Sequence, residues 1–359
     1  MVDLIIDEQK TEVNEGKTVL QAAESLGLEI PTMCHLADHP NFTSCMVCMV
    51  EDESTGQLIP ACSTLATSGM RISTKSEKAV ASRKDALELL LSEHVGDCDA
   101  PCQVVCRAGI DIPAMLRAIA GGDIDRAALI IESTSDTAGN PCEECRGRCE
   151  KACRRGLHDA AVSIQLLIRY ALEYGQPQDQ VEKGDAEPSF NFNCNMGKIQ
   201  DGEIDVFLEQ ASRSVRIEPA DGESEGYSAA EAQEEARRCL HCDCRKRTDC
   251  KLRVYSSEYG ARQRRYAIAR RKPFRQNRQH GGIVYEPGKC IKCGICVRIT
   301  ERERESLGLA FIGRGFDVEV GVPFNESLEA GLEKTACLCA EKCPTGAIAL
   351  QDDIPEGET

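Results

Sequence analysis

The hydrophobic and polar positions near the N-terminus alternate and then change period, which predicts two strands followed by a helix. The segment VDLIIDEQKTEV (residues 2–13) is typical of a β-hairpin. The next segment, TVLQAAESLGL (18–28), has apolar residues at helical spacing and a glycine stop at Gly27. A loop rich in cysteine comes after this helix.

Later segments predict further helices and a few short strands. DALELLLSEH (85–94), IDIPAMLRAIAGG (110–122) and VSIQLLIRYALEYG (162–175) carry apolar residues at helical spacing. SAAE (228–231) is a capping box that begins another helix. GLAFIGRGFDVEVGVPF (308–324) is expected to form strands. Helices in the middle with strands near both ends predict an α+β fold.

The most informative feature of the composition is its high cysteine content. The chain has 359 residues, which is a length typical of two or three domains, and 22 of them are cysteine. The sequence contains no run of 18 apolar residues, so it predicts no helix that spans a membrane. The N-terminus lacks the basic flank and long apolar core of a secretory signal. We therefore expect a cytoplasmic protein, in which thiols stay reduced and metal or cluster binding is the default explanation for so many of them.

The net charge of −16 is unevenly distributed. Residues 245–278 hold thirteen Lys and Arg against two acidic residues, a local charge of +11, so the remainder carries −27 by difference. Such a segment could bind nucleic acid, but no recognised nucleic-acid module accompanies it. We favour a basic strap over thiolate clusters or over an acidic partner surface, with no nucleic acid bound.

The first cysteine group follows the N-terminal strands and helix, and its members are Cys34, Cys45, Cys48 and Cys62. Four thiolates with one close pair suit a [2Fe–2S] cluster, in which each iron takes two cysteines. The C-x10-C spacing is unusual for a zinc ribbon. The pattern resembles the N-terminal [2Fe–2S] domain of the large iron–sulfur subunit of complex I and of related hydrogenases, which implies a β-grasp ferredoxin domain.

A second strong signal lies near the C-terminus, in KCIKCGICVRIT and KCPTGAIAL, and its cysteines are Cys290, Cys293, Cys296 and Cys343. Three closely spaced cysteines and a remote Cys-Pro are typical of a ferredoxin [4Fe–4S] site. The arrangement resembles the single-cluster ferredoxin-type domain of the complex I large subunit.

The middle of the chain holds two further cysteine runs. The stretches CDAPCQVVCRAGIDIP and GRCEKACRRG resemble the two-cluster domain of the glutamate synthase small subunit and of dihydropyrimidine dehydrogenase, over roughly residues 94–175. In that family the two runs interleave, so the resemblance implies two [4Fe–4S] clusters. One would take Cys98, Cys102 and Cys153, and the other Cys106, Cys145 and Cys149.

Each of these two clusters needs a fourth ligand. His94 begins an H-x3-C pattern and is a candidate for the first, although a lone histidine is more often structural. Cys142 is the natural fourth ligand of the second. If the family supplies a residue other than cysteine there, Gln165 or a neighbour would take that place.

A third run, EEARRCLHCDCRKRTDC, contributes Cys239, Cys242, Cys244 and Cys250. Its first part resembles a segment near the C-terminus of the same glutamate-synthase-like flavoproteins, so a further cluster is expected. The spacing alone does not distinguish such a cluster from a zinc knuckle with the same four thiolates. Cys194, Cys337 and Cys339 are left over and are interpreted as structural thiols, with Cys337 or Cys339 an alternative to Cys343.

Two motifs that substrate chemistry would require are missing from the sequence. There is no G-x-G-x-x-G fingerprint of an FAD or NADPH module and no G-x-x-x-x-G-K-[ST] loop. The chain also lacks the cysteine motifs of hydrogenase active sites. We therefore expect an electron-transfer subunit of a hetero-oligomeric oxidoreductase. It would relay electrons between a flavin-containing NAD(P)-binding subunit and a catalytic redox subunit of hydrogenase or formate dehydrogenase type.

The expected organisation follows the cysteine runs. A β-grasp [2Fe–2S] domain would span residues 1–78, a helical two-cluster domain 79–175 and a connector 176–235. A cysteine motif with the basic segment would follow at 236–282, and a ferredoxin-type domain at 283–359. The expected cofactors are one [2Fe–2S] cluster and three to four [4Fe–4S] clusters.

Two other functions stay open on the sequence alone. The chain could be a stand-alone flavo-iron–sulfur oxidoreductase that uses NAD(P)H and binds flavin through a fold without the usual fingerprint. It could also be a zinc-rich protein that binds nucleic acid, which predicts a colourless protein and salt-sensitive binding.

Overall fold

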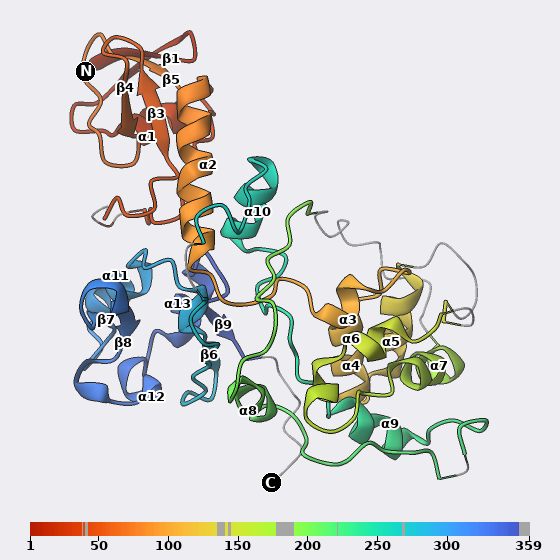
Figure 1. Cartoon of the computed structure of the whole chain (residues 1–359). Helices are drawn as coiled ribbons and strands as arrows, with labels where there is room; N and C mark the ends of the chain where they lie inside the picture. The colour runs from red at the N-terminus through yellow and green to blue at the C-terminus, as the bar shows by residue number, and fades with distance from the viewer. Residues whose placement is uncertain are drawn as a thin grey trace. The chain divides into compact units, whose positions relative to one another are not determined.

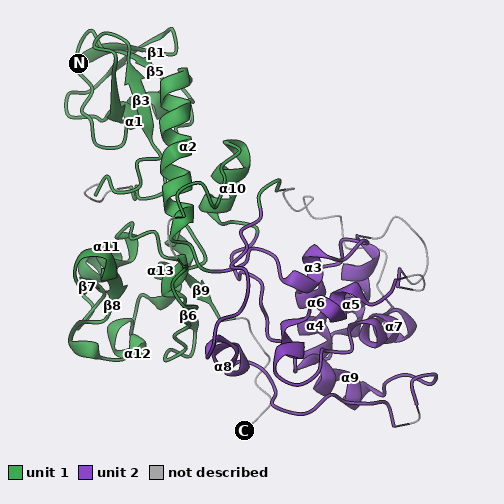
Figure 2. Ribbon diagram, viewed as in Figure 1, with its two compact units in different colours: residues 1–95, 189–192, 248–351 green, residues 96–188, 193–247, 352–359 purple. Residues whose placement is uncertain are grey.

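The structure is a computed structural model in which the chain forms two compact units. It describes residues 1–37, 39, 42–134, 141–142, 145–176, 190–220, 222–267 and 270–351. The first unit contains residues 1–95, 189–192 and 248–351, and the second contains residues 96–188, 193–247 and 352–359 (Figure 2). Helices and small sheets are both present, so the expected α+β class is confirmed (Figure 1).

The N-terminal part of the first unit is a five-stranded mixed sheet. Its strands are β1 (Val2–Ile6), β2 (Gln9–Val13), β3 (Met49–Asp52), β4 (Gln57–Pro60) and β5 (Arg71–Ser73). Their order is β2-β1-β5-β3-β4, with β1 parallel to β5 and the other neighbours antiparallel. The expected hairpin is confirmed, because β1 pairs with β2 in a register that sets Val2 opposite Val13.

One helix packs its apolar face against this sheet. The helix α1 (Val19–Ser25) begins at a capping box formed by Thr18 and Gln21, which satisfies backbone N–H groups that a helix start leaves unpaired. Gly27 follows with φ of +70°, a conformation that favours glycine. The core between helix and sheet includes the buried side chains of Leu4, Ile6, Val19, Leu20, Val50 and Ile72.

The remainder of the first unit consists of short elements around a small second sheet. Helices α2 (Glu77–Ser92) and α10 (Lys251–Glu258) contact each other. Strand β6 (Ile283–Tyr285) pairs with β9 (Ile348–Leu350), and β7 (Ala310–Ile312) pairs with β8 (Glu319–Gly321). The helices of this part are α11 (Ile295–Arg302), α12 (Leu328–Gly331) and α13 (Ala336–Lys342), with 3-10 turns η2 (Pro287–Lys289), η3 (Gly315–Asp317) and η4 (Pro323–Asn325).

The described part of the second unit contains helices and loops but no strands. Its helices are α3 (Pro101–Val104), α4 (Ile112–Ala120), α5 (Ile124–Glu132), α6 (Arg148–Ala152), α7 (Ile164–Tyr174), α8 (Glu203–Leu208) and α9 (Ala229–Ala236), with the 3-10 turn η1 (Arg154–Leu157). α4, α5, α7 and α9 enclose one apolar core that includes Ile112, Leu116, Ile131, Leu167 and Ala232. The capping box expected at Ser228 is present and begins α9.

Several arginines of the basic segment at residues 245–278 pair with acidic side chains of the same chain. In the second unit Arg247 pairs with Asp111 at 2.7 Å. In the first unit Arg265 pairs with the fully buried Glu88 at 2.9 Å, and Arg275 pairs with Glu319 at 2.5 Å. The partners in these pairs are carboxylates of the chain itself, and the expected strap over thiolate clusters or an acidic partner surface stays a prediction. None of the helices among the described residues is long and apolar enough to span a membrane.

Candidate metal centres

The first cysteine group lies in the loops that join α1, β3 and β4. Cys48 directly precedes β3, Cys62 follows β4, and Cys34 and Cys45 lie between α1 and β3. All four are at most 4% exposed. Positive φ angles at Thr43 and Met46 turn the backbone on either side of Cys45. The four thiols predicted from spacing are thus gathered beside the N-terminal sheet.

Hydrogen bonds between thiols join the members of this first group. The thiol of Cys34 interacts with those of Cys45 and Cys62, and backbone N–H groups of Ser44 and Cys45 point at the same sulfur, so the pKa of Cys34 is lowered. The pKa of Cys62 is raised by the thiols of Cys34 and Cys48 and by burial. N–H groups aimed at sulfur stabilise thiolate, the form in which cysteine binds metal.

The C-terminal group encloses a cavity. Cys290 and Cys293 lie in the loop before α11 and Cys296 lies in its first turn, while Cys343 follows α13 directly before Pro344. One cavity is lined by all four, together with apolar side chains such as Ile295, Val320 and Ile348. Burial raises the pKa of Cys290 to about 11, while the N–H of Lys292 donates to its sulfur at 3.4 Å. Thiols desolvated in this way become thiolates when a cation joins them.

A buried arginine lies between these two groups. Arg298, on α11, is 4% exposed and donates from Nη2 to the carbonyl of Cys34 at 2.8 Å. Its guanidinium also stacks over the ring of Phe42, 4.8 Å from the centroid. Burial lowers the pKa of Arg298, and the thiols of Cys293, Cys34, Cys296 and Cys62 act in the opposite direction. One positive charge therefore faces cysteines of both groups.

In the second unit a further cavity is lined by four cysteines, which are Cys106, Cys142, Cys145 and Cys149. Burial raises the pKa of Cys149 to about 12, and Cys142 and Cys106 are among its electrostatic neighbours. Cys142 thus lies beside the other three cysteines of this group, and its role as their fourth ligand stays a prediction. Gln165, the alternative, donates from Nε2 to the carbonyl of Cys145 at 3.0 Å.

The other group of the second unit combines cysteines from runs that are far apart in the sequence. Burial raises the pKa of Cys102 well above its usual value, and the neighbouring thiols of Cys239, Cys153 and Cys242 act in the same direction. Arg154 donates to the thiol of Cys242 and forms an ion pair with Asp97. Asp243 forms a two-pronged ion pair with Arg117 at 3.0 and 3.2 Å.

This arrangement differs from the expected local site at residues 239–250. Cys239 and Cys242 lie near Cys102 and Cys153, whereas the N–H of Cys244 donates to the carbonyl of Cys98 at 3.1 Å. Cys250 belongs to the first unit, where it precedes α10. Side chains two positions apart on an extended segment point the same way, but a turn at Asp243 separates Cys242 from Cys244. Cys98, which is expected from the sequence to join Cys102 and Cys153, makes backbone hydrogen bonds with Cys194 and Cys244.

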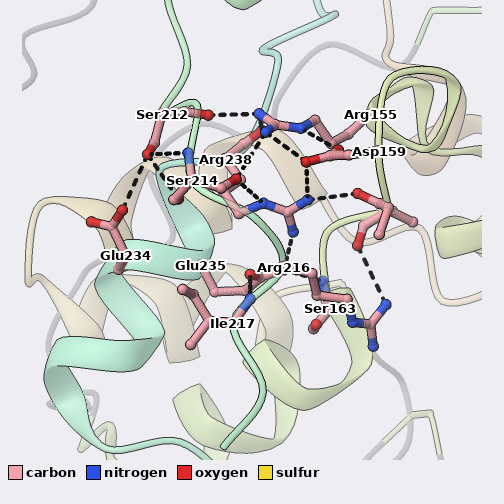
Figure 3. A network of polar contacts seen from close by, with 12 residues as sticks. Arg155, Asp159, Ser163, Ser212, Ser214, Arg216, Ile217, Glu234, Glu235 and Arg238 are labelled. Atoms are coloured by element: carbon pink, nitrogen blue, oxygen red, sulfur yellow. Dashed lines mark hydrogen bonds and ion pairs between the residues drawn. The ribbon is translucent and has the colours of Figure 1, made fainter.

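A buried polar network fixes the segments that carry Cys153 and Cys239 (Figure 3). Arg155 and Arg238 are both fully buried and both pair with Asp159, at 2.7 and 3.1 Å. Arg238 also pairs with the fully buried Glu235 at 2.7 Å. Arg155 is two residues after Cys153, and Arg238 directly precedes Cys239. The network therefore holds together two cysteine segments that are far apart in the sequence.

His94 lies at the end of the first unit, two residues after α2. Burial and the charge of Lys289 lower its pKa to about 3, so the imidazole is neutral at pH 7. Its Nδ1 is buried and has no hydrogen-bond partner among the described residues. A neutral ring with such a nitrogen suits a ligand, and the predicted role of His94 stays a prediction. Cys337 is exposed, and Cys339 is fully buried at 0% exposure within α13.

The spacing of the thiols suits a cluster better than a single ion. Among the described residues, no three His, Cys, Asp or Glu side chains converge closely enough to hold one metal ion. Four thiolates on Zn²⁺ would need sulfurs about 3.8 Å apart, given a Zn–S distance of about 2.3 Å. In two of the groups four cysteines line one cavity, and four thiolates are the ligand set of a [4Fe–4S] cluster.

Comparisons with known families agree with this chemistry. Residues 1–77 match the family described as a 2Fe-2S iron-sulfur cluster binding domain. Residues 78–180 match the family described as dihydropyrimidine dehydrogenase domain II, 4Fe-4S cluster. The first half of the chain consists of two iron–sulfur domains. The expected [2Fe–2S] and [4Fe–4S] cofactors are thereby confirmed as the cofactor types of this protein.

Curated relatives share part of the chain with this iron–sulfur protein. A subunit of NADH-quinone oxidoreductase from Rhizobium meliloti is 35% identical over 169 residues, which cover 43% of this chain and 18% of the relative. The HndD subunit of the NADP-reducing hydrogenase from Solidesulfovibrio fructosivorans is 33% identical over 167 residues, 43% of this chain and 28% of the relative. The alpha subunit of NADPH-Fe(3+) oxidoreductase from Geobacter sulfurreducens is 38% identical over 109 residues, 30% of this chain and 12% of the relative. The chain thus matches less than a third of the length of each of these relatives.

A solved structure shares the fold of this iron–sulfur protein. A chain in the crystal structure of an NAD⁺-reducing [NiFe]-hydrogenase in the H2-reduced state aligns with a TM-score of 0.52 and 17% identity. The alignment covers 98% of this chain and 88% of the other. At this identity the likeness concerns the fold.

Proposed function

We propose that this chain is an iron–sulfur electron-transfer subunit of a multi-subunit oxidoreductase. The observation that carries the proposal is the gathering of sixteen cysteines into four groups of four, two in each unit. Iron–sulfur clusters accept and donate single electrons, and several clusters in one chain can form a conduit.

The ligands follow from these groups. Cys34, Cys45, Cys48 and Cys62 would hold the [2Fe–2S] cluster in a β-grasp domain at residues 1–78. Three [4Fe–4S] clusters would be held by the groups containing Cys293, Cys149 and Cys102. The ferredoxin-type domain would occupy residues 283–359 and the helical cluster domain 79–175, with the segments at 176–235 and 236–282 between them.

The partners are inferred from the names of similar proteins. Relatives named as subunits of NADH-quinone oxidoreductase and of NADP-reducing hydrogenase support a hetero-oligomer in which a separate subunit binds NAD(P) and flavin. A catalytic subunit of hydrogenase or formate dehydrogenase type would take or supply the electrons. Clusters are suited to this position because they connect a two-electron hydride carrier with one-electron chemistry.

Anaerobic purification of the chain, alone and with its native partners, tests this function. We expect a brown protein that contains iron and acid-labile sulfide but no flavin. Dithionite should reduce the clusters of the isolated chain, whereas NADH and NADPH should reduce them only in the native complex. A colourless protein without sulfide would contradict the proposal. Oxidation of NAD(P)H by the isolated chain with bound flavin would favour the stand-alone enzyme instead.

A further inference from the structure

Cys194 belongs to none of the cysteine motifs, yet it lies against a cysteine of the predicted ligand set. The N–H of Cys98 donates to the carbonyl of Cys194 at 3.1 Å, and the N–H of Cys194 donates to the sulfur of Cys98 at 3.3 Å. On the other side of Cys98, its carbonyl accepts the N–H of Cys244 at 3.1 Å. Three segments of the second unit therefore meet at Cys98, and each brings one cysteine.

Further contacts fix the segments of Cys98 and Cys194 together. The N–H of Met196 donates to Asp97 Oδ1 at 2.8 Å, and the N–H of Asp99 donates to Asn193 Oδ1 at 3.3 Å. The other oxygen of Asp97 pairs with Arg154. Because the contacts lie on both sides of the Cys98–Cys194 pair, they hold the two backbone segments together at this point.

The chemistry of the three thiols suits a metal cluster. Cys98 and Cys244 are 7% exposed and Cys194 is 2% exposed, so all three are withdrawn from water. A backbone N–H aimed at the sulfur of Cys98 favours thiolate, as the N–H groups around Cys34 do in the first group. Soft thiolates that converge from separate segments are the ligands that iron–sulfur clusters take.

We propose that Cys98, Cys194 and Cys244 hold a further iron–sulfur cluster, distinct from the one at Cys102. The inference rests on the proposed function, because it assumes that the other groups hold clusters as well. Three thiolates suffice for a [3Fe–4S] cluster, and a fourth ligand completes a [4Fe–4S] cluster. Cys242 and Cys244 are separated by one residue, so this cluster would neighbour the one at Cys102 and extend the conduit.

The iron content of the anaerobically reconstituted wild-type chain tests this site directly. Four groups account for about 14 iron atoms per chain, and a fifth raises the number to about 17 or 18. Saturation at about 14 iron atoms with matching sulfide would overturn the inference while leaving the electron-transfer function intact. A protein without acid-labile sulfide would overturn both.

Substitution of Cys194 then locates the additional iron. Cys194→Ser should lose three or four iron atoms and one EPR component, and the remaining components should stay. Cys337→Ser is the matched control, since Cys337 is exposed and belongs to none of the groups, and it should keep the full iron content. Unchanged iron content and EPR spectra in Cys194→Ser would overturn the inference. If that variant does not fold, the wild-type iron content decides.

Discussion

Arg298 offers a quantitative test of the two cluster sites in the first unit. Its guanidinium is 4% exposed, donates to the carbonyl of Cys34 at 2.8 Å, and faces thiols of both the N-terminal and the C-terminal groups. A reduced cluster carries one more negative charge than an oxidised one. A nearby positive charge therefore stabilises the reduced form and raises the reduction potential of each cluster.

The size of this effect follows from Coulomb's law. Arg298 Nη2 lies 2.8 Å from the carbonyl oxygen of Cys34, and we take about 8 Å as the distance from its charge to a cluster. With an effective dielectric constant of about 20, one unit charge at that distance contributes about 2 kcal/mol. For a one-electron couple this corresponds to about 90 mV. Some screening by solvent reduces it, so Arg298→Gln should lower both potentials by about 50 to 90 mV.

Redox titrations followed by EPR measure both potentials in one sample. Arg298→Lys keeps the charge and should stay near the wild type. Arg302→Gln removes a charge from the same helix, but the Arg302 side chain is 58% exposed. Solvent screens such a charge, so this variant should shift each potential by only a small fraction of the Arg298→Gln shift. A shift confined to one cluster would show that Arg298 does not lie between two clusters. An equal shift in Arg298→Lys would show that its hydrogen bonds, and not its charge, set the potentials.

Four other predictions address ligands and stability. Cys293→Ser should abolish one [4Fe–4S] EPR signal and leave the [2Fe–2S] signal; loss of both would mean that the two sites fold as one. Glu235→Gln should destabilise the second unit by about 3–5 kcal/mol in anaerobic denaturation, because it removes a charge paired at 0% exposure, whereas the exposed Glu234→Gln should cost at most about 1 kcal/mol. The Arg155 guanidinium holds the pKa of Asp159 well below its usual range. The ionised Asp159 therefore contributes to stability fully above about pH 4, and this contribution is lost as pH falls. The difference in stability between wild type and Asp159→Asn should be larger at pH 7 than at acidic pH, and a constant difference would contradict this. His94→Ala should alter one cluster's EPR signal, and an unchanged spectrum would make His94 structural.

Local sequence patterns are enough to predict several elements and to group the cysteines at the two ends of the chain. The hairpin at residues 2–13 and the helix that ends before Gly27 follow from hydrophobic period and a glycine stop. The first and last cysteine groups are predicted from spacing, because each contains a C-x2-C pair and its other members come from one stretch or from a marked position. Cys34 and Cys62 lie in the same loop-rich stretch as the pair Cys45 and Cys48, and the Cys-Pro pair marks the remote Cys343.

The middle groups cannot be predicted in the same way. Cys239 and Cys242 lie next to each other in a single run, but their neighbours Cys102 and Cys153 come from other segments. Cys194 stands alone in its stretch, and no motif distinguishes it from a structural thiol. What assigns these cysteines is the packing of α4, α5, α7 and α9 around one core, which depends on contacts between distant parts of the chain.

The ligands in the second unit are far apart in the sequence. This separation adds little loop-closure entropy, but it makes accurate placement of the sulfurs difficult. The first group spans about 28 positions, from Cys34 to Cys62, and the group from Cys102 to Cys242 spans about 140. Loop-closure entropy grows only with the logarithm of length, so the difference is about 1.4 kcal/mol. Bringing the sulfurs to the same place is the harder requirement, because errors in every intervening contact accumulate. The buried ion pairs of Arg155 and Arg238 with Asp159 help to position the sulfurs, because the two arginines lie within two residues of Cys153 and Cys239. We infer that this polar network is retained in the interior because it positions cluster ligands, whereas apolar side chains of similar volume would contribute stability without fixing that geometry.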